Sequence, residues 1–270
     1  MQYSVKIYAR IGELMQGYLP DAGGFLVSGL PSNLFYTEAI FDSAGSAAAL
    51  PPKAQKALRL FLGEKKLNGA IWLESNIPQG KGLSSSSTDI LSVLFLVNDY
   101  LQIGASQEDL YRIAAAVEPT DPCLSKDITV FRQNLGVVEG RLELPPMGVL
   151  YFDAAPDQQV ETVEVQRQWT AGTGRFFDWL LQRLIWAAEA WDYGTIFDCI
   201  TYSAEYNQTV VPIPYFDRYA RLAREMGAGL MVAHSGTIVG MLTKPDRLTE
   251  MRERLNEVTT EPIYMENYNP

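Results

Sequence analysis

The residues best suited to chemistry lie in a glycine- and serine-rich segment, Pro78–Asp89, which reads PQGKGLSSSSTD. A predicted strand, Ile71–Ser75, precedes it, and an apolar stretch predicted as a buried helix, Ile90–Leu101, follows it. Gly80 and Gly82 let the backbone approach a ligand closely, and the unpaired N–H groups at the start of the following helix favour an anion. The segment therefore predicts a phosphate-binding loop.

Neither of two common nucleotide-binding patterns occurs in this segment. It contains no Gly-x-x-x-x-Gly-Lys-Ser/Thr and no Gly-x-Gly-x-x-Gly, so it differs from the Walker A loop and from the dinucleotide-binding fingerprint. The alternative is a serine-rich helix cap, because serine is a preferred N-cap residue. Four successive serines after two glycines exceed what a cap requires, and their hydroxyls supply further donors and a candidate magnesium ligand.

A second group of candidates follows a predicted helix, in the sequence Glu118-Pro119-Thr120-Asp121-Pro122. Phosphoryl transfer needs a positioned nucleophile and neutralisation of the triphosphate, so carboxylates from elsewhere in the chain must converge on the loop. Asp121 is the leading catalytic candidate, because a carboxylate beside the substrate hydroxyl accepts or orients its proton. The alternatives are a turn aspartate between prolines for Asp121 and a surface charge at a helix end for Glu118.

Two further polar sites remain open to two interpretations each. Ala233–Thr237 lies between two predicted strands, where its polar side chains would close over a substrate or would form an ordinary hairpin turn. His234 is the only histidine, which excludes a histidine-rich metal site. Arg10 would stabilise charge on a transferred phosphoryl group, or would be an exposed arginine at a strand end.

The composition is that of a globular protein large enough to bury a core. The chain has 270 residues, is 47% hydrophobic, and carries a formal charge of -10, which disfavours a nucleic-acid partner. The two cysteines, Cys123 and Cys199, are not spaced like zinc ligands, so no structural zinc site is predicted. No stretch is apolar over the length needed to cross a membrane, and the first ten residues alternate polar with apolar, so the chain is predicted to be cytoplasmic.

Hydrophobic periodicity predicts both strands and helices. The predicted strands are Ser4–Ala9, Phe25–Ser28, Phe35–Ile40, Ile71–Ser75, Val149–Asp153, Leu230–Ala233, Thr237–Leu242 and Pro262–Glu266. The predicted helices are Pro51–Phe61, Ile90–Leu101, Gln107–Val117 behind a capping box at Ser106 and Asp109, stretches between Gly174 and Tyr206, Tyr215–Met226 and Pro245–Asn256. The pattern restarts after Pro145, so we expect an α+β fold with domains at residues 1–145 and 146–270.

The phosphate-binding segment resembles that of the GHMP kinases, the superfamily of galactokinase, homoserine kinase and mevalonate kinase, whose loop reads Pro-x-x-x-Gly-Leu-Gly/Ser-Ser-Ser. Two further segments agree with that superfamily in kind and order, Gly12–Gly17 near the start and Ala233–Thr237 near the end. Together with Glu118–Asp121 they look most like the L-threonine kinases of cobalamin side-chain synthesis, although Ala9–Ile11 departs from those enzymes' Pro-Gly turn followed by Ser-Cys. The resemblance implies a two-domain fold, with an N-terminal ATP-binding domain like domain 2 of ribosomal protein S5 and a ferredoxin-like C-terminal domain.

The resemblance also implies ATP and Mg²⁺ as cofactors and assigns roles to individual residues. Asp121 would be catalytic, and Ser86 and Glu118 would bind magnesium. The nucleotide would be bound by Pro78, Gly80, Lys81, Gly82, Leu83, Ser84, Ser85, Ser86 and Ser87, and the substrate by Glu13, Gln16, His234, Ser235, Gly236 and Thr237. Asp127 is a second acidic candidate if the correspondence after Pro122 is shifted.

The expected reaction is ATP-dependent phosphorylation of a hydroxy amino acid, with L-threonine giving O-phospho-L-threonine. The alternatives are a kinase of the same superfamily for homoserine, a sugar or an isoprenoid precursor, and a non-catalytic ligand sensor on the same fold. Retention of Asp121, Glu118 and the serine loop argues against the sensor. We expect a small-molecule substrate, no nucleic-acid or membrane partner, and a monomer or homodimer.

Overall fold

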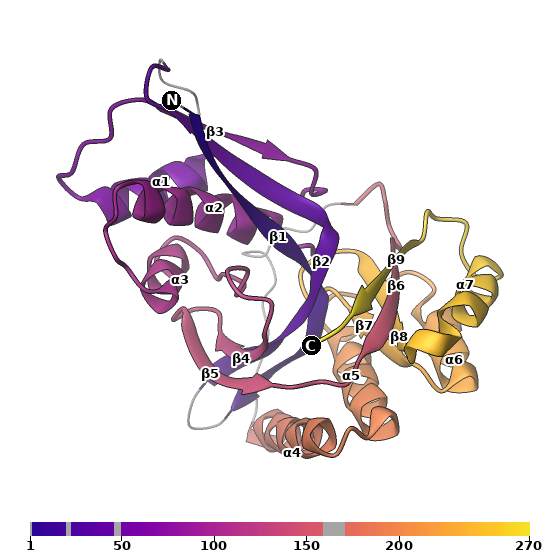
Figure 1. Ribbon diagram of the computed structural model, residues 1–270. Helices are drawn as coiled ribbons and strands as arrows, with labels where there is room; N and C mark the ends of the chain where they lie inside the picture. The colour runs from indigo at the N-terminus through magenta and orange to yellow at the C-terminus, as the bar shows by residue number, and fades with distance from the viewer. Residues whose placement is uncertain (1, 20–22, 46–49, 159–170) are drawn as a thin grey trace.

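The computed structural model describes residues 2–19, 23–45, 50–158 and 171–270. Within them, the strands form one sheet in the order β5-β4-β2-β1-β7-β8-β6-β9, and β3 also pairs with β2 (Figure 1). The strands are β1 (Gln2–Leu19), β2 (Gly23–Asp42), β3 (Ala70–Ser75), β4 (Ile128–Arg132), β5 (Val137–Leu142), β6 (Met147–Asp153), β7 (Gly229–Val232), β8 (Ile238–Thr243) and β9 (Tyr264–Tyr268). The paired strands are antiparallel, so the predicted α+β arrangement is confirmed.

The helices follow the predicted order closely. They are α1 (Pro52–Leu62), α2 (Ser85–Tyr100), α3 (Gln107–Ala115), α4 (Ala171–Glu189), α5 (Tyr193–Asn207), α6 (Phe216–Met226) and α7 (Leu248–Asn256), with a single 3₁₀ turn, η2 (Pro245–Arg247), before α7. The capping box before α3 is confirmed, because the Ser106 side chain accepts from the Asp109 N–H and the Asp109 carboxylate accepts from the Ser106 N–H. None of the described helices is long and apolar enough to cross a bilayer.

Three apolar cores hold the helices to the sheet. In the first, α1, α2 and α3 pack against β1–β3, with Phe41 and Leu94 fully buried between them. Figure 1 shows these three helices together on one side of the long β1–β2 ribbon. The second contains α4 and α5 with β1 and β6, and the third contains α6 and α7 with β6–β8. The buried helix predicted at Ile90–Leu101 is therefore the centre of the first core, as α2.

The strands β4 and β5 are absent from the sequence interpretation. The sequence of β4, ITVFR, is buried at its first four residues, so it lacks the alternation that marks a half-exposed strand. The edge strand β5 contains Gly140, and Leu142 is its one buried residue, which weakens its apolar signal. Both strands lie beside the segment that carries Asp121, and they fix where that segment returns to the sheet.

A division of the chain near Pro145 stays a proposal. The strand β1 pairs along its length with β2, from the proposed first domain, and also with β7, from the proposed second domain, where Glu13 lies opposite Val232. Residues of both proposed domains therefore meet at Glu13.

Candidate functional site

The loop between β3 and α2 has a backbone that requires glycine. Gly80 and Gly82 have φ values of 68° and 88°, in the left-handed region that glycine adopts without steric cost. A Cβ on Gly82 would lie 2.1 Å from the Cβ of Ala233, so this position has no room for a side chain. The loop thus passes directly against the end of β7.

The other two sequence motifs hold this loop in place through backbone hydrogen bonds. The Gly12 N–H donates to the Gly82 carbonyl at 3.2 Å, and the Thr237 N–H donates to the Lys81 carbonyl at 3.0 Å. A Cβ on Gly236 would lie 2.3 Å from the Lys81 carbonyl oxygen, so glycine is needed there for the close approach. The three segments that stand far apart in the sequence therefore meet at one place.

The N-terminus of α2 faces a cavity of about 360 Å³. The first N–H groups of a helix have no partner within the helix, and the Ser84 side chain, at the N-cap position, does not cap them. The cavity is lined by Glu13, Pro51, Pro52, Lys53, Ala54, Gln79, Gly80, Gly82, Ser84, Ser85, Ser86, Ser87, Asp89, Ile90, Glu118, Pro119, Asp121, Gln133 and Ser235. Free N–H groups and a helix dipole beside an open cavity form an anion-binding site.

Glu118 lies beside the helix terminus, lines the cavity and is almost fully buried. Its Oε1 accepts a hydrogen bond from the Ser86 hydroxyl, and its Oε2 accepts one from the Lys53 ammonium at 2.5 Å. Within the described residues, no three histidine, cysteine or acidic side chains are grouped to hold a metal. Glu118 and Ser86 nevertheless fit Mg²⁺, which prefers hard oxygen ligands and takes most of the remainder from phosphates and water.

Asp121 lies beside the same helix terminus. Its Oδ2 accepts from the Ser87 hydroxyl at 3.3 Å, and its own N–H donates to the same hydroxyl at 2.9 Å. Burial raises the pKa of the Asp121 carboxyl to about 6, and the nearby charge of Glu13 acts in the same direction. A carboxylate that titrates near neutral pH and faces a cavity is suited to proton transfer.

Gln133 holds the second oxygen of Asp121, and Gln16 contacts Gln133. The Gln133 amide donates to Asp121 Oδ1 at 3.3 Å, and the Gln16 amide donates to Gln133 Oε1 at 2.9 Å. Gln133 lines the cavity, whereas Gln16, a predicted substrate-binding residue, does not. In the structure Gln16 therefore reaches the site only through Gln133.

Glu13 and His234 form a buried pair from β1 and the β7–β8 connection. Glu13 Oε2 accepts from the His234 N–H at 2.9 Å and lies 3.2 Å from His234 Nδ1. The other ring nitrogen, Nε2, lies 3.4 Å from the Ser203 hydroxyl on α5. Glu13 and Ser235 line the cavity, while the His234 ring lies behind Glu13. His234 thus orients a cavity carboxylate.

Several residues assigned to the nucleotide or substrate point elsewhere. The Lys81 ammonium is buried against Asp153 Oδ2 at 2.8 Å and donates to the carbonyls of Ala155 and Pro156. The Thr237 hydroxyl donates to the same aspartate, at 2.5 Å from Oδ1. Among the predicted residues, those that do not line the cavity are Pro78, Lys81, Leu83, Gln16, His234, Gly236 and Thr237.

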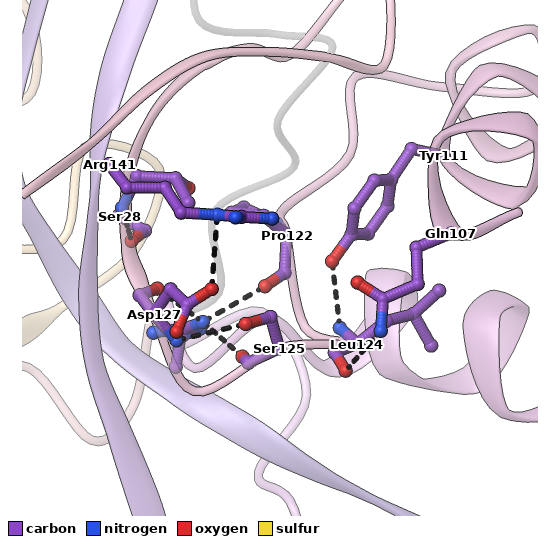
Figure 2. A network of polar contacts seen from close by, with 10 residues as sticks. Ser28, Gln107, Tyr111, Pro122, Leu124, Ser125, Asp127 and Arg141 are labelled. Carbon is purple, nitrogen blue, oxygen red and sulfur yellow. Dashed lines mark hydrogen bonds and ion pairs between the residues drawn. The ribbon is translucent and has the colours of Figure 1, made fainter.

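Arg10 is buried and binds the segment that follows Asp121. Its guanidinium donates to the carbonyls of Pro122 at 3.1 Å and Asp127 at 2.9 Å, and also to that of Ser125. Figure 2 shows these three residues turned toward one another, with Asp127 also paired to Arg141 at 3.1 Å. Burial lowers the pKa of Arg10. Arg10 is therefore neither exposed nor a lining residue, and it holds the Asp121 segment in shape.

Among the lining residues that sequence reasoning missed are Lys53, Gln133 and Asp89. Lys53 stands in the first turn of α1, where a cation opposes the helix dipole, and this unusual placement was the available signal. Gln133 follows β4 and gives no local signal. Asp89 belongs to the predicted loop segment, but its hydrogen bond from Thr37 at 2.9 Å and a pKa raised by burial appear only in the fold.

Comparisons with known proteins give one matching family and a similar kinase. Residues 52–126 match the family described as the GHMP kinases N terminal domain. The L-threonine kinase of Salmonella typhimurium is 27% identical over 252 residues, which cover 87% of this chain and 80% of that protein.

Two solved structures share the fold over nearly the whole chain. The homoserine kinase of Cytophaga hutchinsonii has a TM-score of 0.67 at 15% identity and covers 98% of this chain and 94% of its own. The phosphomevalonate kinase of Streptococcus pneumoniae has a TM-score of 0.77 at 12% identity and covers 99% of this chain and 100% of its own. The α+β fold expected from the sequence is confirmed over nearly the whole chain, and the division into two domains stays a proposal.

Proposed function

We propose that this chain, an ATP-dependent small-molecule kinase of the GHMP superfamily, phosphorylates the side-chain hydroxyl of L-threonine to give O-phospho-L-threonine. The observation that carries the proposal is that Asp121 and the free N-terminus of α2 line one cavity. A triphosphate bound at the helix terminus would thus lie within reach of an alcohol beside the carboxylate.

Each wall of the cavity has a distinct task in this reaction. The backbone of Gly80–Ser87 would bind the phosphates, since its glycines and the helix terminus present N–H groups. Asp121 would accept or orient the hydroxyl proton, and its ionised form predominates above about pH 6. Ser86 and Glu118 would hold Mg²⁺, which neutralises charge on the transferred phosphoryl group.

The preference for an amino acid is supported by the chemistry around Glu13. This carboxylate lines the cavity near Asp121 and is held by two contacts to His234, so it presents a fixed anion to a substrate ammonium. The similarity to an L-threonine kinase along most of the chain supports threonine over other hydroxy amino acids. We place the reaction in the cytoplasm, with its product used in cobalamin side-chain synthesis.

A substrate panel tests the proposal. Purified protein with ATP and MgCl₂ is incubated with L-threonine, D-threonine, L-serine, L-homoserine, mevalonate or galactose, and ADP formation is followed while products are identified by mass. We expect the highest kcat/KM with L-threonine and a product heavier by one phosphoryl group. Turnover of homoserine or mevalonate alone would assign another alcohol, and no turnover of any amino acid would refute the proposal.

A further inference from the structure

The charges that line the cavity are unbalanced. Four lining residues carry carboxylates, Glu13, Asp89, Glu118 and Asp121, whereas Lys53 is the one cation among the described lining residues. A nucleotide triphosphate brings several more negative charges, which the dipole of one helix does not offset. Any lysine that can reach the phosphates therefore has a large effect on nucleotide affinity.

Lys53 occupies a position that is unfavourable for a lysine unless an anion is nearby. It lies in the first turn of α1, and that turn contains no acidic residue to interact with the positive end of the helix dipole. Its partner is Glu118, on another segment, at 2.5 Å. The Lys53 side chain is 48% exposed and that of Glu118 only 5%, so the carboxylate is fixed while the lysine has room to move.

The ion pair between Lys53 and Glu118 occupies Glu118 Oε2, an oxygen that a metal ion would use. Glu118 Oε1 is bound by Ser86 and Oε2 by Lys53, so the ammonium stands where a cation would approach this carboxylate. We infer that Lys53, which pairs with Glu118, is a phosphate-binding residue that turns to the nucleotide phosphates when Mg²⁺ engages Glu118. A flexible ammonium is suited to both partners, because it binds carboxylate and phosphate oxygens as a point charge.

This inference rests on the proposed kinase function and adds a residue that no sequence motif assigns. The competing explanation is a half-exposed surface ion pair without further role, which is worth little in general. The two explanations differ in whether replacing Lys53 changes metal affinity and nucleotide affinity. A phosphate-binding Lys53 competes with a metal ion for Glu118 and strengthens nucleotide binding, whereas a surface ion pair does neither.

Binding measurements on Lys53→Met and Lys53→Arg separate these explanations. The matched control is Lys56→Met, because Lys56 is exposed on the same helix, one turn further on, and does not line the cavity. Each protein is titrated with Mn²⁺ alone by electron paramagnetic resonance, and with the non-hydrolysable analogue AMP-PNP plus MgCl₂ by calorimetry. Neither readout depends on turnover.

We expect Lys53→Met to bind Mn²⁺ roughly threefold more tightly than the wild-type protein and AMP-PNP roughly 10- to 100-fold more weakly. Lys53→Arg should retain most of the AMP-PNP affinity, and Lys56→Met should match the wild type in both titrations. If Lys53→Met also matches the wild type, the inference is wrong. If the wild-type protein itself binds no AMP-PNP, the proposed function fails, and the inference fails with it.

Discussion

The pKa of the Asp121 carboxyl sets the pH range in which this residue can accept a proton. Burial and the Glu13 charge raise it to about 6, while hydrogen bonds from Ser84, Gln133 and Ser87 act in the opposite direction because they favour the ionised form. Below this pKa the carboxyl is protonated and cannot act as a base. The value of kcat/KM should therefore rise with pH up to about 6 and then level off.

Replacing Gln133 by leucine tests this assignment. Leucine keeps much of the volume and removes the donor to Asp121 Oδ1, so the ionised carboxylate loses support and its pKa rises further. We expect the acidic limb of the kcat/KM profile to move up by roughly one pH unit. Gln55→Leu, an exposed change on α1, is the control and should leave the profile in place. Coincident profiles for the two variants would show that Gln133 does not tune Asp121.

At the scale of elements, the loop before α2 depends on one glycine for its path. Ala at position 82 would be strained at a φ of 88° and would bring its Cβ to 2.1 Å from that of Ala233. Gly104, between α2 and α3, has a φ of 79°, but a Cβ added there would meet nothing within 4 Å, so Gly104→Ala isolates the backbone strain.

We expect Gly104→Ala to lower the free energy of unfolding by about 1–2 kcal/mol and to leave AMP-PNP binding unchanged. Gly82→Ala should lower the free energy of unfolding by more than Gly104→Ala does, because its Cβ would also collide with that of Ala233. It should abolish AMP-PNP binding in calorimetry, because the displaced loop no longer directs its N–H groups at the phosphates. Nucleotide affinity equal to that of the wild type in Gly82→Ala would mean that the loop does not bind phosphate.

The conformation of the segment after Asp121 depends on hydrogen bonds from Arg10. Arg10→Met leaves the buried carbonyl of Pro122 and the partly buried carbonyls of Ser125 and Asp127 without this donor. We expect Arg10→Met to lower the free energy of unfolding by about 3 kcal/mol or more, which lowers Tm by roughly 6–12 °C. Arg141→Met removes the exposed ion pair to Asp127 on the same segment (Figure 2) and should shift Tm by less than about 3 °C. Equal shifts would contradict a structural role for Arg10.

Most elements could be predicted from the sequence because their apolar residues repeat with a clear period. The helix predicted at Pro51–Phe61 is α1, Pro52–Leu62, which begins at a proline and ends before Gly63. The strand predicted at Ser4–Ala9 is only the alternating start of β1. From Ala9 to Met15 every side chain is buried, so no alternation marks the rest of the strand.

The site could be predicted only in part for a related reason. Gly80, Gly82 and the serines form a local sequence motif for phosphate binding, and the resemblance to known kinases predicted that Asp121 and Glu118 belong to the same site. Lys53 and Gln133 reach the cavity from α1 and from the turn after β4, and such meetings arise from the tertiary fold alone. Lys81 was predicted to bind the nucleotide because it lies in the loop, but its ammonium forms an ion pair with Asp153.

At the scale of the whole molecule, the cavity lies where the two proposed domains meet. Glu13 and Asp121 come from residues 1–145 and Ser235 from residues 146–270, while Lys81 and Asp153 form a buried ion pair across the same boundary. A ligand in this cavity should therefore stabilise both parts together.

Thermal unfolding with AMP-PNP and MgCl₂ tests this coupling. At a ligand concentration about 100 times its Kd, binding adds about 2.7 kcal/mol, which for a chain of this size raises Tm by roughly 5–10 °C. We expect one unfolding transition that moves as a whole in calorimetry. Two transitions, of which only the first moves, would show that the ligand contacts one part alone.

The central claim is that the Asp121 carboxylate acts on the substrate hydroxyl beside the phosphate loop. Its most direct test is the rate of ATP-dependent L-threonine phosphorylation by Asp121→Asn, with Asp127→Asn as the matched control, because the Asp127 side chain is half exposed and paired to Arg141. We predict that Asp121→Asn lowers kcat at least ~100-fold with AMP-PNP affinity retained, and that Asp127→Asn stays within about twofold of the wild type. A nearly unchanged kcat in Asp121→Asn, or a large loss in Asp127→Asn alone, would contradict the account.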